Sequence, residues 1–188
     1  MLRYIEENGK YVEITGFKNV KIADVDKFLE KIRREKQPNI ETQFFDAKLV
    51  ATWQHLYFAV LNALTAFKNR ENISKSLEVE TMLYASAQRQ IQKAIKLLGI
   101  HRDSSDIAVV IVGEKPENLK SALSTVAKHI NTQPDETALE LTKEKMTTIQ
   151  KAFKIADEEL ETVMKKDDHK EALIGLVIER MALLAIHR

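Results

Sequence analysis

The segment Asp106–Gly113, with the sequence DIAVVIVG, most restricts the fold of this 188-residue chain. Its continuous run of apolar, mostly β-branched residues predicts a strand that is buried on both faces. Two alternating segments, Tyr11–Phe17 and Ile40–Ala47, also predict strands, and Thr137–Leu141 is a further candidate. We therefore expect a small β-sheet with Asp106–Gly113 as its central strand.

Helical periodicity follows between and after these strands. Asp24 is a suitable N-cap for a helix over Asp24–Lys36. In a long helix over Leu49–Lys68, a helical wheel places His55 on the polar side, away from the apolar stripe. The other expected helices span Leu77–Ala85, Ala87–Leu98 with a left-handed cap at Gly99, Glu117–Ile130, and the remainder to Arg188 with a break near Lys165–His169.

Strands that interleave with helices predict a mixed α/β (α+β) fold with a small central sheet, flanking helices and a long helical C-terminal part. Because no segment has the composition of a linker, we expect one domain over residues 1–188. The chain has no Cys, which excludes disulfides and suits the cytoplasm. No charge-free apolar run approaches the roughly 20 residues of a membrane span.

Catalytic and metal-binding patterns are absent from the sequence. The five glycines are too scattered for a phosphate-binding loop. Asp167, Asp168 and His169 lie among lysines and are interpreted as a solvated turn. His55 has no orienting partner in the sequence that would make it a general base. We therefore expect no enzyme, no cofactor and no metal.

Charge is distributed unevenly along the chain, although the formal net charge is +1. Residues 47–102 carry eight basic and three acidic side chains, a net charge of +5, which leaves −4 for the remainder. Arg89, Lys93 and Lys96 repeat at i, i+4 and i+7 and share one helix face. Glutamines flank Arg89 at the expected helix N-terminus, where free N–H groups favour an anion. An RNA phosphate with a nearby base would suit this set, and a solvated basic helix face is the alternative.

The last expected helix, over about 171–187, is apolar on nearly every side. Glu179 and Arg180 are its only charges between Leu173 and Ile186. Its apolar arc of roughly 220° exceeds the stripe of somewhat over 100° found on surface helices. Such a helix is either buried centrally or packs on the core with one side and on a partner with the other. The candidate partner-binding residues are Leu173, Leu176, Val177, Ile178, Met181 and Leu184.

Three specific patterns lie between Val50 and Ile100. They are His55-Leu-x-x-Ala59, a serine-containing turn with a Glu-rich helix start over 73–80, and Ser86-x-x-Arg89-Gln-Ile91. In these residues the chain resembles the PRPK-binding subunit family of the KEOPS (EKC) complex. It departs from that family at Ala87, where members often carry Gly.

The resemblance implies a non-catalytic, regulatory subunit of the machinery that makes N6-threonylcarbamoyladenosine (t6A) in tRNA. It implies binding to an atypical kinase-like ATPase subunit and to the 3′ CCA end of tRNA. A purely structural, kinase-activating adaptor that does not touch RNA is the alternative. The candidate tRNA-binding residues are Ser86, Gln88, Arg89, Gln90, Lys93, Lys96, Lys75 and Arg70.

Overall fold

The computed structural model describes residues 1–165 and 168–186. The chain divides into two compact units, each made of two stretches of sequence. The first unit comprises residues 1–47 and 100–138, and the second comprises residues 48–99 and the chain from Leu139 onward. Strands occur in the first unit and long helices in both, so the mixed α+β class expected from the sequence is confirmed.

The first unit contains a four-stranded antiparallel sheet in the order β1-β2-β4-β3. The central strand β4 pairs with β2 on one side and β3 on the other, so that Val109 lies opposite both Thr15 and Phe44. Every residue of β4 is buried, as its apolar sequence predicts. The strands are β1 (Leu2–Ile5), β2 (Lys10–Phe17), β3 (Glu41–Asp46) and β4 (Ile107–Gly113), and a short 3-10 helix, η1 (Glu6–Asn8), joins β1 to β2.

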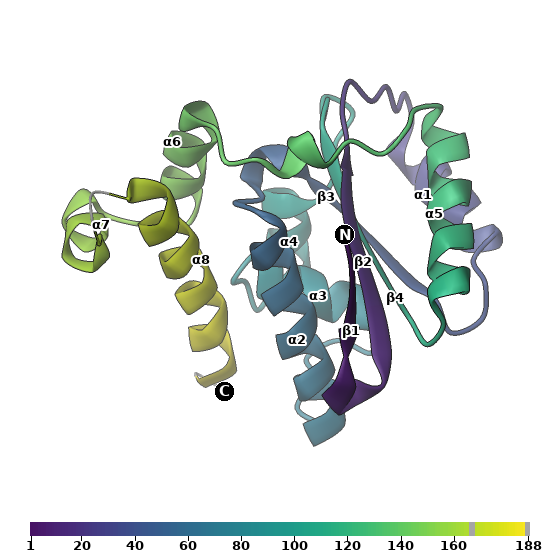
Figure 1. The fold of residues 1–188 in the computed structure, drawn as a ribbon, viewed down its shortest axis with the longest axis horizontal. Coiled ribbons are helices and arrows are strands. Elements are labelled where there is room, and N and C mark those ends of the chain that lie inside the picture. Colours follow the sequence, from purple (N-terminus) through teal and green to yellow (C-terminus); the bar gives the residue numbers. More distant parts are fainter. Residues whose placement is uncertain (166–167, 187–188) are drawn as a thin grey trace. The chain divides into compact units, whose positions relative to one another are not determined.

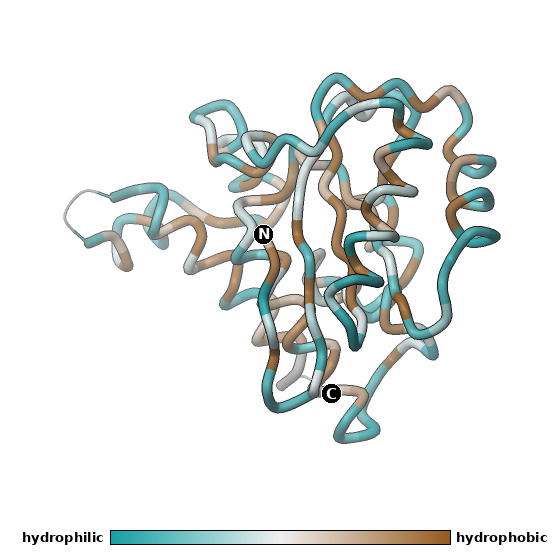
Figure 2. Tube along the Cα trace, turned by 45° about the vertical axis from the view of Figure 1, so that its right-hand side comes forward, coloured by the Kyte–Doolittle hydropathy of each residue, from teal (hydrophilic) through white to brown (hydrophobic). Residues whose placement is uncertain are grey.

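Two helices, α1 (Val25–Arg34) and α5 (Pro116–Ile130), lie on the same side of this sheet (Figure 1). The Asp24 side chain caps α1 by accepting the Lys27 N–H at 3.0 Å, and Pro116 occupies the first turn of α5. In Figure 2 these helices alternate between hydrophobic and hydrophilic residues, as elements with one buried face do. Their apolar side chains form one core with the sheet, which includes Phe17, Phe28, Phe44, Val109, Ile111, Leu119 and Val126.

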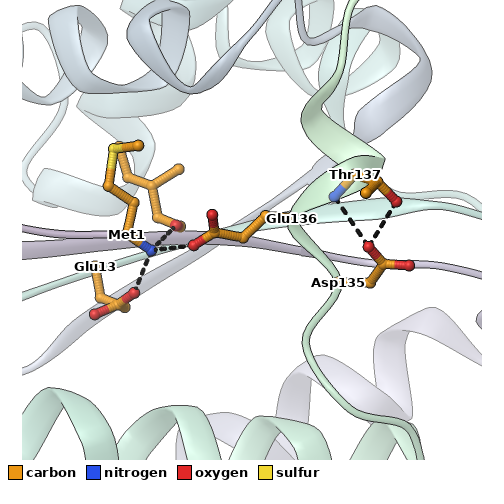
Figure 3. Close-up of polar contacts among 6 residues, drawn as sticks. Met1, Glu13, Asp135, Glu136 and Thr137 are labelled. Carbon is orange, nitrogen blue, oxygen red and sulfur yellow. Dashed lines mark hydrogen bonds and ion pairs between the residues drawn. The ribbon is translucent and has the colours of Figure 1, made fainter.

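The expectation of a strand over Thr137–Leu141 is wrong, because a 3-10 helix, η3 (Glu136–Leu139), covers most of this segment. The Asp135 carboxylate accepts hydrogen bonds from the Thr137 hydroxyl at 2.6 Å and the Thr137 N–H at 2.9 Å (Figure 3). These bonds lower the pKa of Asp135. An Asp that binds the backbone two residues further on favours a turn over an extended strand.

The segment that leads to η3 is held against β2. The Asp135 N–H donates to the Gly16 carbonyl at 2.7 Å, and the Met1 ammonium group donates to the Glu13 and Glu136 carboxylates at 2.6 and 2.8 Å (Figure 3). Burial lowers the pKa of the ammonium group, but the hydrogen bonds and charges of the two glutamates outweigh burial and raise it.

In the second unit, α2 packs along α3 and α8, and α6 and α7 also pack on α8. A 3-10 helix, η2 (Ala47–Leu49), precedes these helices. The apolar core of the unit includes Ala51, Ile149, Phe153, Leu160, Leu173, Leu176 and Val177. The helices are α2 (Trp53–Asn69), α3 (Leu77–Ala85), α4 (Ile91–Leu98), α6 (Lys143–Ala152), α7 (Asp157–Val163) and α8 (His169–Ile186).

The sequence did not predict the break at residues 153–156, between α6 and α7. Three helix ends in this unit also differ from the sequence expectation. The long helix starts at Trp53 rather than Leu49, because Thr52 is extended and serves as its N-cap position. Gly99 ends α4 with φ −67°, so it is not left-handed. A glycine is still required there, because a Cβ on Gly99 would lie 2.5 Å from the Ile95 carbonyl oxygen. The third difference, at the start of α4, shapes the candidate site.

Candidate nucleic-acid interface

A cavity of about 370 Å³ lies in the second unit, between the α3–α4 turn and the C-terminal half of α8. Its wall contains three cationic side chains, two carboxamides and an apolar surface from α8. Phosphate binding uses such cations, and base edges and faces use carboxamides and apolar groups. The lining residues are Ala87, Gln88, Arg89, Gln90, Lys93, Arg180, Leu183 and Leu184.

The turn that leads into the cavity is a Schellman motif at the end of α3. The Ala87 N–H donates to the Tyr84 carbonyl at 2.9 Å, and the Gln88 N–H donates to the Leu83 carbonyl at 3.0 Å. Ala87 has φ 50°, in the left-handed region that glycine normally occupies. This left-handed residue ends one helix before the next begins, which is why α4 does not start at Ala87 as expected.

The N-terminus of α4 opens beside the cavity. Gln90 is the N-cap and its side chain makes no capping hydrogen bond, while the Ala94 N–H makes the helical bond back to the Gln90 carbonyl at 3.0 Å. The first turn contains no acidic residue. The N–H groups that precede Ala94 and the helix dipole therefore add to the positive potential of Lys93 and Arg89.

Arg180 reaches the cavity from α8 and was not predicted from the sequence. One nitrogen of its guanidinium group, Nη2, donates to both Glu159 carboxylate oxygens, at 2.5 and 2.8 Å. The sequence separates Arg180 from Arg89 by about 90 positions, so no local spacing connects them. The available signal was that Arg180 is one of two charges in an otherwise apolar segment.

The structure brings together four of the eight candidate tRNA-binding residues, namely Gln88, Arg89, Gln90 and Lys93. Lys96 is exposed further along α4 and does not line the cavity. Ser86 is fully buried, and its hydroxyl donates to the Met82 and Leu83 carbonyls at 2.8 and 3.1 Å. Ser86 therefore stabilises the end of α3 and is not presented to solvent.

The last two candidates, Arg70 and Lys75, lie at the other end of α3. Arg70 follows α2 in a left-handed conformation, and Lys75 is exposed in the loop that precedes α3. Nine helical residues correspond to about 13 Å between the ends of α3. Arg70 and Lys75 therefore do not contribute to the cavity wall.

Glu80 is fully buried and binds the loop that precedes α3. Its Oε2 atom accepts the N–H groups of Ile73 and Ser74 at 3.0 and 2.7 Å. From its place in the first turn of α3, the sequence suggests only an interaction with the helix dipole. Its main contacts are instead backbone hydrogen bonds, which fix the loop that carries Lys75.

The expectation that His55 faces away from the core is wrong. His55 is fully buried, its Nδ1 accepts the Ala51 N–H at 3.2 Å, and its Nε2 lies 2.7 Å from the Ala85 carbonyl. The ring also packs edge-on against Phe153. Burial lowers the pKa of His55 to about 4, despite the opposing bond to Ala85. A helical wheel describes the faces of α2 alone, whereas contacts from Ala51, Ala85 and Phe153 bury this side chain.

The residues predicted to bind a partner on α8 lie mostly in the core of the second unit. Leu173, Leu176, Val177, Met181 and Leu184 are buried. Ile178 is half-buried, as is Ile174 one turn before it, so these two residues form the accessible border of the apolar arc. The end of the expected 171–187 range, residue 187, lies outside the described residues.

Within residues 1–165 and 168–186, no group of three or more His, Cys, Asp or Glu side chains is arranged to hold a metal ion. Asp167, from the turn interpreted as solvated, lies outside the described residues. The described helices also include none that is long and apolar enough to cross a membrane.

Comparison with known proteins identifies the family. The model of the family "Kinase binding protein CGI-121" matches residues 17–185. The chain is 32% identical over 116 residues to the "Regulatory protein Cgi121" of Methanocaldococcus jannaschii, which covers 62% of this chain and 72% of that protein. It is 26% identical over 161 residues to the "EKC/KEOPS complex subunit cgi121" of Aspergillus fumigatus, which covers 83% and 82%. The resemblance found between Val50 and Ile100 is thus confirmed, and the chain belongs to the CGI-121 family.

Proposed function

We propose that this chain is a non-catalytic cytoplasmic subunit of a KEOPS complex that supports t6A modification of tRNA. In this function it binds the kinase-like ATPase subunit and recruits tRNA through its 3′ CCA end. The relatives' names support membership of the complex. The observation that carries the RNA-binding part is the cavity at the α3–α4 turn, with its three cations and two carboxamides.

The cavity suits a short single-stranded end better than a duplex. Arg89 and Lys93 supply charge for one or two phosphates, Arg180 is paired with Glu159, and Gln88 and Gln90 supply donors and acceptors for base edges. A volume of about 370 Å³ admits a base but not a helix of RNA. Because the net charge of the chain is only +1, affinity depends on these local contacts and not on a general positive field.

A gel shift with the isolated chain tests this proposal. We expect tRNA that carries its CCA end to bind at least about tenfold more tightly than the same tRNA without it, a difference of about 1.4 kcal/mol. The two RNAs share their duplex and differ only in the three terminal nucleotides, so the tRNA without CCA is the control for non-specific binding to the rest of the molecule. Equal binding of both RNAs would overturn the recruitment of tRNA by its CCA end.

Kinase binding is assigned to the accessible border of α8. Ile174 and Ile178 are half-buried, one turn apart, and adjoin the stripe that packs on the core. A partner that covers them would remove apolar surface from water at roughly 25 cal/mol per Å². The family description, "Kinase binding protein CGI-121", supports a kinase as that partner.

Substitution on α8 tests the kinase contact. We expect Ile178→Glu to reduce co-purification with the kinase subunit by about tenfold or more, because it places a charge in an apolar contact. Glu179→Lys, at an exposed position of the same helix, is the control and leaves co-purification unchanged. Leu176→Glu is unsuitable because Leu176 is buried and the substitution would unfold the helix packing. Normal co-purification of Ile178→Glu would exclude this border of α8.

The second candidate function is a structural adaptor that activates the kinase without touching RNA. The ion pair between Arg180 and Glu159 favours it, because one cation of the cavity is already neutralised. This alternative predicts the same effect of Ile178→Glu on co-purification and no gel shift with either form of tRNA. The two functions are therefore separated by the RNA experiment alone.

A further inference from the structure

His55 connects two segments that meet behind the cavity turn. Ala51 precedes α2 and lies in the apolar core of the second unit, and Ala85 is the last residue of α3. The imidazole ring spans them, with Nδ1 bound to the Ala51 N–H and Nε2 bound to the Ala85 carbonyl. Two residues after Ala85, the chain enters the cavity wall at Ala87.

These bonds determine the ring's orientation and tautomer. A carbonyl only accepts, so Nε2 must carry the proton that it donates to Ala85, and Nδ1 must then be the acceptor for Ala51. The Ala85 carbonyl is one of the groups at a helix C-terminus that lack a helical partner. Because Ala85 and His55 are both fully buried, the Ala85 carbonyl has no access to solvent and depends on His55 for this hydrogen bond.

We infer that His55 is a positioning residue, which ties the end of α3 to the core and thereby sets the position of Gln88 and Arg89 in the cavity wall. It is not a ligand-contacting residue, because its side chain has no exposed surface. The consequence for RNA rests on the proposed function, whereas the consequence for the turn does not.

Two substitutions separate the two bonds of the ring. In His55→Gln the side-chain amide lies near the former Nε2 and donates to Ala85, but the bond from Ala51 is lost. In His55→Asn the side-chain oxygen lies near the former Nδ1 and accepts from Ala51, but the bond to Ala85 is lost. Each variant leaves one buried backbone group without its partner, so the two are matched in their expected loss of stability.

The experiment compares the two variants at a temperature where far-UV circular dichroism shows both folded. We expect the Gln88 amide, which bonds the Leu83 carbonyl, to exchange with solvent roughly fivefold faster in His55→Asn than in His55→Gln, as about 1 kcal/mol of lost support predicts. The Val177 amide in α8 is the control for general opening and exchanges at the same rate in both. Affinity for CCA-tailed tRNA should fall by a similar factor in His55→Asn alone.

Equal exchange at Gln88 in the two variants would overturn the inference, because a general structural role affects both alike. Unequal exchange with equal tRNA affinity would also overturn it, since the turn would then not control the cavity. If the wild-type chain does not distinguish tailed from untailed tRNA, the proposed function fails, and the exchange rates still decide whether His55 positions the turn.

Discussion

The two ends of α3 (Leu77–Ala85) are held in similar ways but present different surfaces. At each end a fully buried polar side chain binds backbone groups, namely Glu80 for the loop before the helix and His55 for the end of the helix. An exposed cation lies near each end, with Lys75 in the loop before the helix and Arg89 beyond the turn after it. A cavity is found at the Arg89 end, where α8 supplies a second wall.

This difference shows that basic residues in one stretch of sequence do not define one site. Lys75 and Arg89 belong to the same positively charged segment, but they are separated by the length of a helix. The residue that completes the cavity, Arg180, comes from a part of the chain with little charge.

The largest expected effect is the response of the Arg89 end to acid. The folded pKa of His55, about 4, lies below its ordinary value of 6.5, so the unfolded chain binds this proton at higher pH than the folded chain. The stability from neutral His55 is therefore complete above pH 6.5 and lost as the pH falls toward 4, by about 3 kcal/mol. Urea unfolding of wild type and His55→Gln between pH 7.5 and 4 measures it. A stability difference between the two proteins that does not change with pH would contradict this role.

The next effect concerns the loop end. Glu80→Gln replaces a carboxylate whose Oε2 accepts the Ile73 and Ser74 N–H groups and whose Oε1 also accepts the Ile73 N–H, so the Ile73 N–H would face an amide donor. We expect a loss of about 2 kcal/mol in the free energy of unfolding, measured by urea titration. The affinity for tRNA should stay within roughly twofold of wild type where the variant is folded, since a change that small corresponds to under 1 kcal/mol. A large loss of affinity would show that the loop end also contributes to binding.

A charge-reversal pair compares the two ends directly. Arg89→Glu should weaken binding of CCA-tailed tRNA about tenfold or more, because it removes a cation from the cavity and adds a repulsive charge. Lys75→Glu makes the same charge change on the exposed loop and should weaken binding by less than about threefold, as expected for a distant, screened charge. Fluorescence anisotropy at one salt concentration gives both affinities. Equal losses would mean that the cavity has no special role.

The smallest effect is expected at the turn itself. Ala87→Gly removes the Cβ from a residue at φ 50° and should raise the free energy of unfolding by about 1 kcal/mol. Thermal or urea unfolding measures the gain. Ala122→Gly, inside α5 and half-buried like Ala87, is the control and should destabilise the protein, because glycine is unfavourable in a helix interior. Destabilisation by Ala87→Gly would show that contacts of this Cβ outweigh the backbone conformation.

Elements with strong local signals could be predicted from the sequence. The Asp24 cap, the Leu77–Ala85 helix and the buried strand β4 agree with the structure, because capping and continuous burial leave their own residue patterns. The left-handed turn at Ala87 carried no such pattern, since alanine is a good helix former. The sequence therefore suggested that α4 begins there.

The site could be predicted only where its residues are neighbours in the chain. Gln88, Arg89, Gln90 and Lys93 were found because they surround one helix N-terminus. Arg180 comes from another helix, and the burial of His55 depends on segments that pack against it from elsewhere in the sequence. Both depend on tertiary packing, which helical periodicity does not describe.

Titration of the isotope-labelled chain with the trinucleotide CCA, followed by backbone amide chemical shifts, tests most directly whether the cavity binds the end of tRNA. We predict saturable shifts in residues 87–93 and 180–184, with little change in residues 70–76. The trinucleotide AAC, which has the same phosphates, serves as the control and should give weaker shifts. Shifts confined to residues 70–76, or identical shifts with both trinucleotides, would contradict recognition of the CCA end by this cavity.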